Sequence, residues 1–172
     1  MRGHNGNEDI QGLMVSGQFF RALQTPPLMG RYLTPADDQP GGNTEGFAVV
    51  ISQHFWRRWF NSAPNVVGRK LVIANVPFTV VGVMPTKFFG ADPTQRPEAY
   101  VPLSTEFILD APYNMTAGGI HANWLRVMAR LKPGVSLQQA NAALLALSMP
   151  IVREQVSDAD WIANAEQTHY HF

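Results

Sequence analysis

The chain has 172 residues, and 13 basic side chains balance 13 acidic ones, so we expect no nucleic-acid partner, because nucleic-acid-binding domains usually present a basic surface. It contains no cysteine, which excludes a disulfide scaffold and a cysteine-ligated zinc site. Hydrophobic residues make up 45% of the chain, enough to close a core, yet no apolar run reaches the roughly 18–20 residues that cross a bilayer.

The first ordered element is expected at residues 11–15, a short apolar run that predicts a strand. A helix over residues 17–23 follows, with Ser16 as the N-cap whose oxygen accepts from an N–H group of the first turn. A Pro-Pro pair then ends this helix, because proline cannot donate to a continuing one. Residues 30–46 are rich in Gly, Pro, Asp and Asn and predict a surface loop.

Residues 47–51 form a continuous apolar run, the pattern of a strand that is covered on both faces. Ser52 is predicted to cap a helix over residues 53–60. Aromatic side chains repeat on this helix at four-residue spacing, so their rings form neighbouring stripes that need burial. We therefore assign four aromatic residues of the helix to the core: Phe55, Trp56, Trp59 and Phe60.

A β-hairpin is expected next, with strands at residues 71–73 and 76–84 joined by an Ala-Asn bend. The second strand is apolar on nearly both faces and stops at a proline. We place Gly68 and Gly82 among the turn and cap positions, and we assign three valines to the core: Val80, Val81 and Val83.

Residues 86–122 predict an irregular connection with one brief strand at 99–101. Residues 124–131 then alternate cleanly between apolar and polar side chains, the pattern of a half-buried strand. This pattern places Leu125 and Val127 on the core face of that strand.

A turn at Pro133 and Gly134 leads to a second predicted helix. Ser136 and Gln139 have the spacing of a capping box at its start. Apolar side chains at three- and four-residue steps give this helix one apolar stripe, and Pro150 is expected to kink or end it.

Three sets of polar residues are candidates for chemistry, and each has a simpler explanation. His169 and His171 would face one side of a strand and could hold zinc or copper, whereas the alternative is a polar tail without a metal. An acidic set could offer oxygen ligands to calcium, but its spacing is irregular, and a solvated acidic loop is the favoured explanation: Asp37, Asp38 and Glu45. His54 could act as a general base, but no nucleophile or acid accompanies it at a recognisable spacing.

The glycine pairs at residues 41–42 and 118–119 do not match a phosphate-binding loop, because neither is followed by Lys-Ser or Lys-Thr. We therefore predict no catalytic, cofactor-binding or metal-binding residue, and a protein that is not an enzyme.

Eight short segments occur in order between Leu13 and Leu147: QFFRAL at 18–23, MGRYL at 29–33, VVIS at 49–52, FW at 55–56, VGR at 67–69, FTVVGV at 78–83, YVPL at 100–103 and LKPGVS at 131–136. In this order and spacing they resemble the periplasmic core domain of MacB-like ABC transporter permeases, the group that also contains FtsX-like proteins. Each segment is common by itself, and it is the series that carries the resemblance.

The resemblance implies an α+β fold with two lobes, in which a mixed sabre-like lobe interrupts a porter-like lobe built from strand-helix units. It divides the chain as follows: a flexible start at 1–10, the end of the first porter-like half at 11–28, the inserted sabre-like lobe at 29–85, an irregular connection at 86–122, the second porter-like half at 123–156 and a tail at 157–172. The family domain begins before Leu13, so we expect the chain to be a fragment with an exposed sheet edge.

The resemblance also implies a non-catalytic domain on the periplasmic side of the bacterial inner membrane. Such a domain transmits conformational change for efflux or for lipoprotein or substrate extrusion. Its expected partners are the transmembrane helices of the same permease, a cytoplasmic ATPase, a periplasmic adaptor and a second copy paired through the sheet edge. The alternative is a stand-alone periplasmic binding module for a lipid, peptide or protein ligand.

Overall fold

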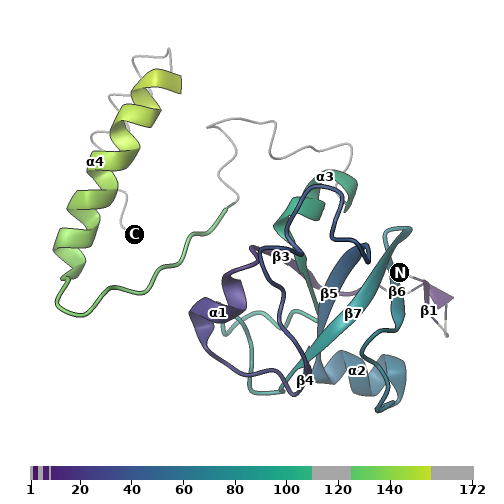
Figure 1. Ribbon diagram of the computed structural model, residues 1–172. Coiled ribbons are helices and arrows are strands. Elements are labelled where there is room, and N and C mark those ends of the chain that lie inside the picture. Colours follow the sequence, from purple (N-terminus) through teal and green to yellow (C-terminus); the bar gives the residue numbers. More distant parts are fainter. Residues whose placement is uncertain (1, 4–5, 8, 110–124, 156–172) are drawn as a thin grey trace. The chain divides into compact units, whose positions relative to one another are not determined.

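The computed structural model describes residues 2–3, 6–7, 9–109 and 125–155 (Figure 1). The chain divides into two compact units, Met1–Met115 and Thr116–Phe172, and each is described by itself. Among the described residues, no helix is both long enough and apolar enough to cross a membrane.

The first unit is built on one mixed sheet of eight strands, in the order β2-β1-β6-β7-β5-β8-β3, with β4 also pairing β7. Most neighbouring strands are antiparallel, but β5 runs parallel to β7 and β3 runs parallel to β8. The strands are β1 (Arg2–Gly3), β2 (Gly6–Asn7), β3 (Gly12–Val15), β4 (Met29–Gly30), β5 (Phe47–Ser52), β6 (Lys70–Ile73), β7 (Val76–Met84) and β8 (Ala99–Pro102).

Short helices accompany the sheet in this unit: α1 (Phe19–Leu23), α2 (Gln53–Phe60), the 3₁₀ helix η1 (Leu103–Thr105) and α3 (Glu106–Leu109). Helix α1 begins later than predicted, and its N-cap is Gln18, which makes no side-chain capping bond. The predicted cap Ser16 contributes its backbone oxygen instead, which accepts from the N–H of Phe19 at 3.0 Å.

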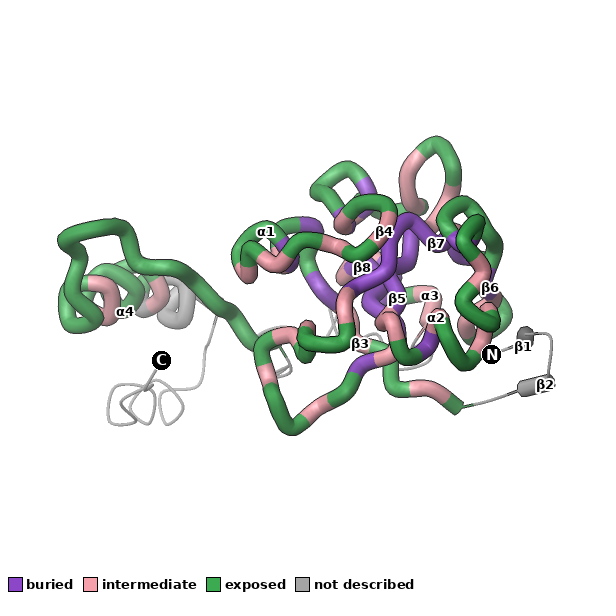
Figure 2. The backbone as a smooth tube through the Cα atoms, turned by 90° about the horizontal axis from the view of Figure 1, so that it is seen from below, coloured by how far each residue is buried: buried purple, intermediate pink, exposed green. Residues whose placement is uncertain are grey.

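The core lies on both faces of β5, β7 and β8, and the burial colours of Figure 2 are concentrated there. Alternate residues of β5 separate the two sides, because Val49 and Ile51 pack with Phe55 of α2, whereas Val50 packs with Phe20 of α1. Helices α1 and α2 therefore cover opposite faces of the sheet. Each fully buried aliphatic or aromatic side chain contributes about 1.5–3 kcal/mol of transfer free energy, so these central strands supply most of the unit's stability.

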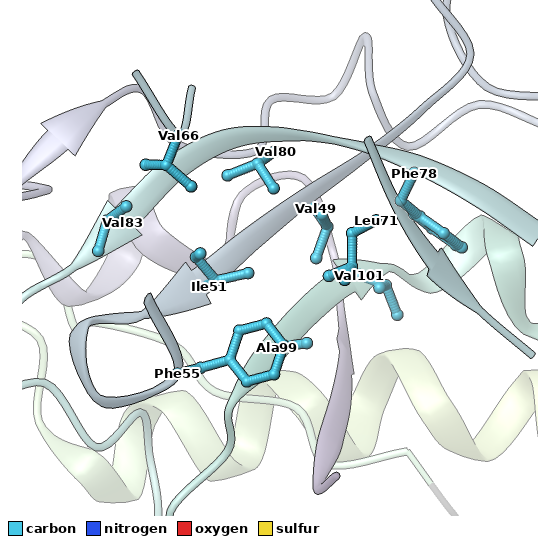
Figure 3. Packing of buried hydrophobic residues seen from close by; sticks show 10 residues of the cluster. All are labelled: Val49, Ile51, Phe55, Val66, Leu71, Phe78, Val80, Val83, Ala99 and Val101. Carbon is cyan, nitrogen blue, oxygen red and sulfur yellow. The ribbon is translucent and has the colours of Figure 1, made fainter. Parts of the chain in front are cut away.

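Helix α2 forms where the sequence predicts it. The Oγ of Ser52 accepts from the N–H of Phe55 at 3.1 Å, and Asn61 ends the helix in a left-handed conformation with φ of 48°. Phe55 is fully buried and stacks on Trp59 at 5.4 Å between ring centroids. Figure 3 shows its ring among the buried side chains contributed by β5, β7 and β8. Three of the four aromatic residues assigned to the core are only half-buried: Trp56, Trp59 and Phe60.

The β6–β7 hairpin also has the predicted bounds to within one residue. Ala74 and Asn75 both have positive φ, 48° and 67°, as a two-residue hairpin turn of the favoured twist requires. Val80 and Val83 are fully buried and Val81 is 8% exposed.

The assignment of Gly82 to a turn is wrong, because this residue lies inside β7. A Cβ atom at Gly82 would lie 2.1 Å from the backbone oxygen of Arg31, so glycine is needed where the chain after β4 passes over β7. Gly68 does lie in a turn, with φ of 90°.

The predicted boundary between residues 28 and 29 falls between two strands of one sheet. Strand β3 precedes it and β4 follows it, and both belong to the same sheet. The physical reason is that β8, which comes much later in the chain, pairs with β3 on one side and β5 on the other.

In the second unit, the strand predicted from residue 124 is absent over residues 125–130, which have no regular secondary structure. Leu125 is 55% exposed and Val127 is 85% exposed, so neither is a core residue in this structure. An alternating segment forms a strand only beside another strand, and the described residues of this unit provide none.

Helix α4 (Leu137–Gln155) is the main element of the second unit. Its capping box is formed, since the Ser136 N–H donates to Oε1 of Gln139 at 2.9 Å and the Gln139 N–H donates to Oγ of Ser136 at 3.1 Å. The turn before it has Gly134 at φ of 81°, directly after Pro133. The helix continues past Pro150, so proline does not end it as one alternative predicted.

Candidate functional site

No metal-binding constellation is present in the part of the chain that the structure describes. There, no group of three or more His, Cys, Asp or Glu side chains could hold a metal ion. His54 lies exposed on α2. His169 and His171 lie outside the described residues, so their metal-binding alternative stays an expectation.

The acidic set divides by burial, because Asp37 belongs to a buried polar network, whereas Asp38 is half-buried and Glu45 is exposed. Asp37 is 1% exposed, and its Oδ1 accepts from Nη2 of Arg31 at 2.9 Å and from Nδ2 of Asn43 at 2.8 Å. Its Oδ2 accepts from Nη1 of Arg31 at 2.6 Å and from both the N–H and the hydroxyl of Thr34 at 2.8 Å. With so many donors on its oxygens, Asp37 has no lone pair directed at an open cation site.

Electrostatics at Asp37 follow from these contacts. Burial by itself would raise the pKa of this carboxyl, but the hydrogen bonds from Arg31 and Thr34, together with the positive charge of Arg31, outweigh it and lower the pKa to about 2. The hydrogen bond between Arg31 and Asp37 also raises the pKa of Arg31. This pair is therefore ionised throughout the neutral range.

Asp38, the next residue, connects two segments that are distant in sequence. Its Oδ2 accepts from the N–H of Gly17 at 3.0 Å, and its Oδ1 accepts from the N–H of Ser104 at 2.8 Å. The carboxylate thereby joins the segment before α1 to η1. These contacts give Asp37 and Asp38 a structural role instead of a calcium-binding one, whereas Glu45 is exposed.

An aromatic cluster lies on the α1 side of the sheet, around Tyr100 of β8. The ring of Tyr100 contacts those of Phe20 and Phe88 at 5.4 and 5.6 Å between centroids. Burial raises the pKa of Tyr100 to about 12, and its buried hydroxyl has no hydrogen-bond partner among the described residues. This side of the sheet is a packed aromatic and aliphatic core.

The opposite side contains an apolar pocket of about 220 Å³ beside β3, partly open to solvent. Its floor is formed by Ala99 and Val101 of β8, which are buried. The other lining residues come from β3 and its approach, the β6–β7 hairpin and α3: Ile10, Gly12, Met14, Ile73, Ala74 and Leu109. Because β3 is the last strand of the sheet, this pocket lies beside an open edge.

The second unit presents a further apolar surface. The stripe predicted for α4 includes Leu137, Leu144 and Leu147, which are 61%, 45% and 68% exposed. Figure 2 shows α4 mostly in the colour of exposed residues. A helix that leaves such a stripe uncovered is suited to packing against another element.

Sequence reasoning missed the residues that make the pocket. Gly12 was part of a predicted strand, and a glycine inside a strand is the available signal for close approach of another chain or ligand. The Arg31–Asp37 pair was missed as well, because a six-residue separation across a loop has no characteristic pattern.

The geometry of the described residues does not by itself identify a protein family, whereas comparison with known proteins does. The MacB-like periplasmic core domain family matches residues 1–147. The chain is 30% identical over 151 residues to the macrolide export ATP-binding/permease protein MacB 1 of Yersinia pestis bv. Antiqua (strain Antiqua) and to that of Yersinia pseudotuberculosis serotype I (strain IP32953). This match covers 86% of the chain but 21% of each relative, so the chain spans about a fifth of their length.

A solved structure gives the same fold. The periplasmic region of MacB from Actinobacillus actinomycetemcomitans matches with a TM-score of 0.56 and 20% sequence identity, over 91% of this chain and 65% of that one. The mixed sheet and its helices are therefore the fold of a MacB periplasmic region. The chain belongs to the MacB-like periplasmic core domain family, and it corresponds to the periplasmic domain of a MacB-like ABC transporter permease.

Proposed function

We propose that this domain is a non-catalytic transmission and docking element of its permease. The observation that carries the proposal is the fully buried centre of the sheet. Val49, Val50 and Ile51 of β5 are all fully buried, as are Val80 and Val83 of β7. A sheet with its central strands covered on both faces is stiff, and a stiff body can pass a displacement from membrane helices to a partner without deforming.

The site chemistry supports the same proposal. The carboxylates of Asp37 and Asp38 are engaged by internal donors, and His54 lies exposed on α2. In this proposal ATP hydrolysis takes place in a cytoplasmic ATPase, and the domain responds to movement of the transmembrane helices of its own permease.

Partners are proposed from the surfaces. We assign docking of a periplasmic adaptor to the open edge at β3 and the exposed loops of the first unit, and pairing with a second copy is the competing use of the same edge. We assign residues 123–156, which lie in the second unit, to the second porter-like half, and we assign the sabre-like lobe to the first unit. The exposed apolar stripe of α4 fits an element that packs against other parts of a permease.

The transported substrate is proposed only as a class. Curated relatives are named as macrolide exporters, and efflux or extrusion of a lipoprotein or another substrate suits a transmission domain. The alternative function is a stand-alone periplasmic module that binds a lipid, peptide or protein ligand, and the apolar pocket beside β3 favours it.

The deciding experiment is to sequence the parent reading frame on both sides of residues 1 and 172. Apolar spans of about 20 residues on both sides would support the permease domain. A secretion signal upstream and a stop codon close to residue 172 would overturn it and leave the binding module.

A second experiment tests transmission in the complete parent protein. The chain has no cysteine, so one cysteine at exposed Gln11, beside β3, would react there alone within this domain. Cross-linking of this cysteine to the bound partner that stops transport but leaves ATP binding intact is the expected result. Unchanged transport in a fully cross-linked sample would contradict the proposal.

A further inference from the structure

The edge strand β3 has unused backbone groups on its outer side. Its inner side pairs with β8, where Gln11 O accepts from the N–H groups of Glu98 at 2.8 Å and Ala99 at 3.5 Å. In a parallel ladder the residues of a strand alternate between bonding inward and pointing outward. The register therefore directs the N–H and C=O groups of Gly12 and Met14 away from β8, and no strand pairs there within residues 9–109.

The same two residues line the apolar pocket. Side chains alternate between the two faces of a strand, so Gly12 and Met14 share the pocket face, whereas Leu13 packs with the cluster around Tyr100. An incoming strand at this edge would thus place every second side chain on the pocket face.

Nothing within the described fold requires glycine at residue 12. The backbone there is not in the left-handed region, and an added Cβ atom would have Ala99 O at 4.0 Å as its nearest neighbour. Gly12 is the first residue of β3, and glycine there costs backbone entropy and leaves no side chain to pack. A glycine with open space beside it leaves room for a ligand or another backbone to approach closely.

Pocket size selects the kind of occupant. Sites for drug-sized ligands usually measure about 300–1,000 Å³, and this one, at about 220 Å³, is smaller. Dry apolar cavities of about 150 Å³ accept a group as large as benzene, so one large apolar side chain fits here. The unused backbone groups select a polypeptide, because only another backbone can satisfy alternating donors and acceptors along an edge.

We infer that the β3 edge and its pocket bind an extended segment of a partner protein, which adds a strand at Gly12 and Met14 and inserts one large apolar side chain into the pocket. This inference rests on the proposed docking function and specifies the chemistry of the partner. A second copy of the chain and a small apolar molecule are the competing occupants, and the experiment distinguishes them.

The probe is a peptide selected from a displayed library of random peptides of about eight residues, longer than the usual 5–6-residue strand, on the complete 172-residue chain. We expect selected peptides to alternate in polarity around one large apolar residue. Binding should slow amide hydrogen exchange at Gly12 and Met14, as measured by NMR. Selection that returns no binding peptide, or peptides that protect other segments, would overturn the inference.

Gly12→Leu is the decisive variant, because it fills the pocket from the edge strand itself. We expect the peptide's Kd to rise at least about tenfold while the melting temperature stays equal or increases. The control Leu13→Met, a volume-conserving change on the opposite face, should leave the Kd unchanged. Peptide binding that survives Gly12→Leu would contradict the inference.

The two competing occupants have distinct signatures. Sedimentation that shows a dimer, lost in Gly12→Leu, together with failure to select a peptide would assign the edge to a second copy. Binding of benzene at the pocket without any selected peptide would assign it to small apolar molecules. Both results would overturn the peptide site and leave the membrane context, tested by the reading frame, untouched.

Discussion

Arg31 holds the Asp37 carboxylate with both terminal nitrogens, at 2.6 and 2.9 Å, although the Asp37 side chain is 1% exposed and that of Arg31 is 46% exposed. The pair is therefore asymmetric. Water can solvate the guanidinium if the carboxylate is lost, but it cannot solvate the carboxylate if the guanidinium is lost.

This asymmetry predicts unequal costs for removing either partner. Arg31→Met leaves a buried carboxylate without its counter-charge and should lower the free energy of unfolding by about 3–5 kcal/mol. Asp37→Asn keeps part of the hydrogen bonding and should cost about 1–3 kcal/mol. Urea unfolding at neutral pH measures both, and equal losses would refute the asymmetry.

Acid should weaken the fold through Asp37. Its pKa is lowered from 3.8 to about 2 in the folded state, so its contribution is complete above the unfolded value and is lost as the pH falls toward 2. The contribution is about 2 kcal/mol. We expect the stability difference between the parent chain and Asp37→Asn to shrink between pH 5 and about pH 2. A difference that is independent of pH would show that Asp37 does not titrate as described.

Removing the Tyr100 hydroxyl should stabilise the first unit. This buried oxygen has no partner among the described residues, so Tyr100→Phe removes a desolvated group and should raise the free energy of unfolding by about 1 kcal/mol. Tyr32→Phe is the matched control, because the Tyr32 hydroxyl donates to Thr25 O at 2.7 Å and its loss should destabilise. Thermal melts in which the melting temperatures of both variants shift in the same direction would contradict this prediction.

Gly82 should not tolerate even one methyl group. Its Cβ atom would lie 2.1 Å from Arg31 O, a backbone atom that cannot rotate away, so Gly82→Ala should cost at least about 2 kcal/mol. Gly12→Ala, with 4.0 Å to the nearest atom, is the control and should be neutral or stabilising. Chemical denaturation compares the two, and similar midpoints would show that the chain near Arg31 can shift.

Alanine substitutions in the two units should have very different effects on the free energy of unfolding. Phe55→Ala removes a fully buried ring and should cost about 3–5 kcal/mol. Val127→Ala alters a side chain that is 85% exposed and should change stability by less than about 0.5 kcal/mol. A large loss of stability in Val127→Ala would instead support the predicted core position of Val127.

Local signals predicted the elements whose ends carry their own chemistry. Helix α2 has Ser52 in front and Asn61 behind, and strand β7 stops before Pro85, so these bounds follow from neighbouring residues. The capping box of α4 is a similarly local feature, since Ser136 and Gln139 satisfy each other.

Features that depend on distant segments could not be read in the same way. The alternation at residues 125–131 shows that one face is apolar, but it does not identify the strand that would cover it. Gly82 resembles any glycine of a strand until the chain at Arg31 is seen to pass over it. The pocket likewise requires β3, β8, α3 and the hairpin together, which are separated in sequence.

The pairing of β3 with β8 has a kinetic consequence. Gly12 meets Ala99 only after the chain between them has been organised, whereas β6 and β7 are joined by a two-residue turn. Closing so long a loop costs entropy before any contact repays it, so the hairpin should form early and β3 should join the sheet late. During synthesis and refolding, the outer edge of β8 is then the last surface of the sheet to be protected, and that interval is when pairing with a wrong strand competes with folding.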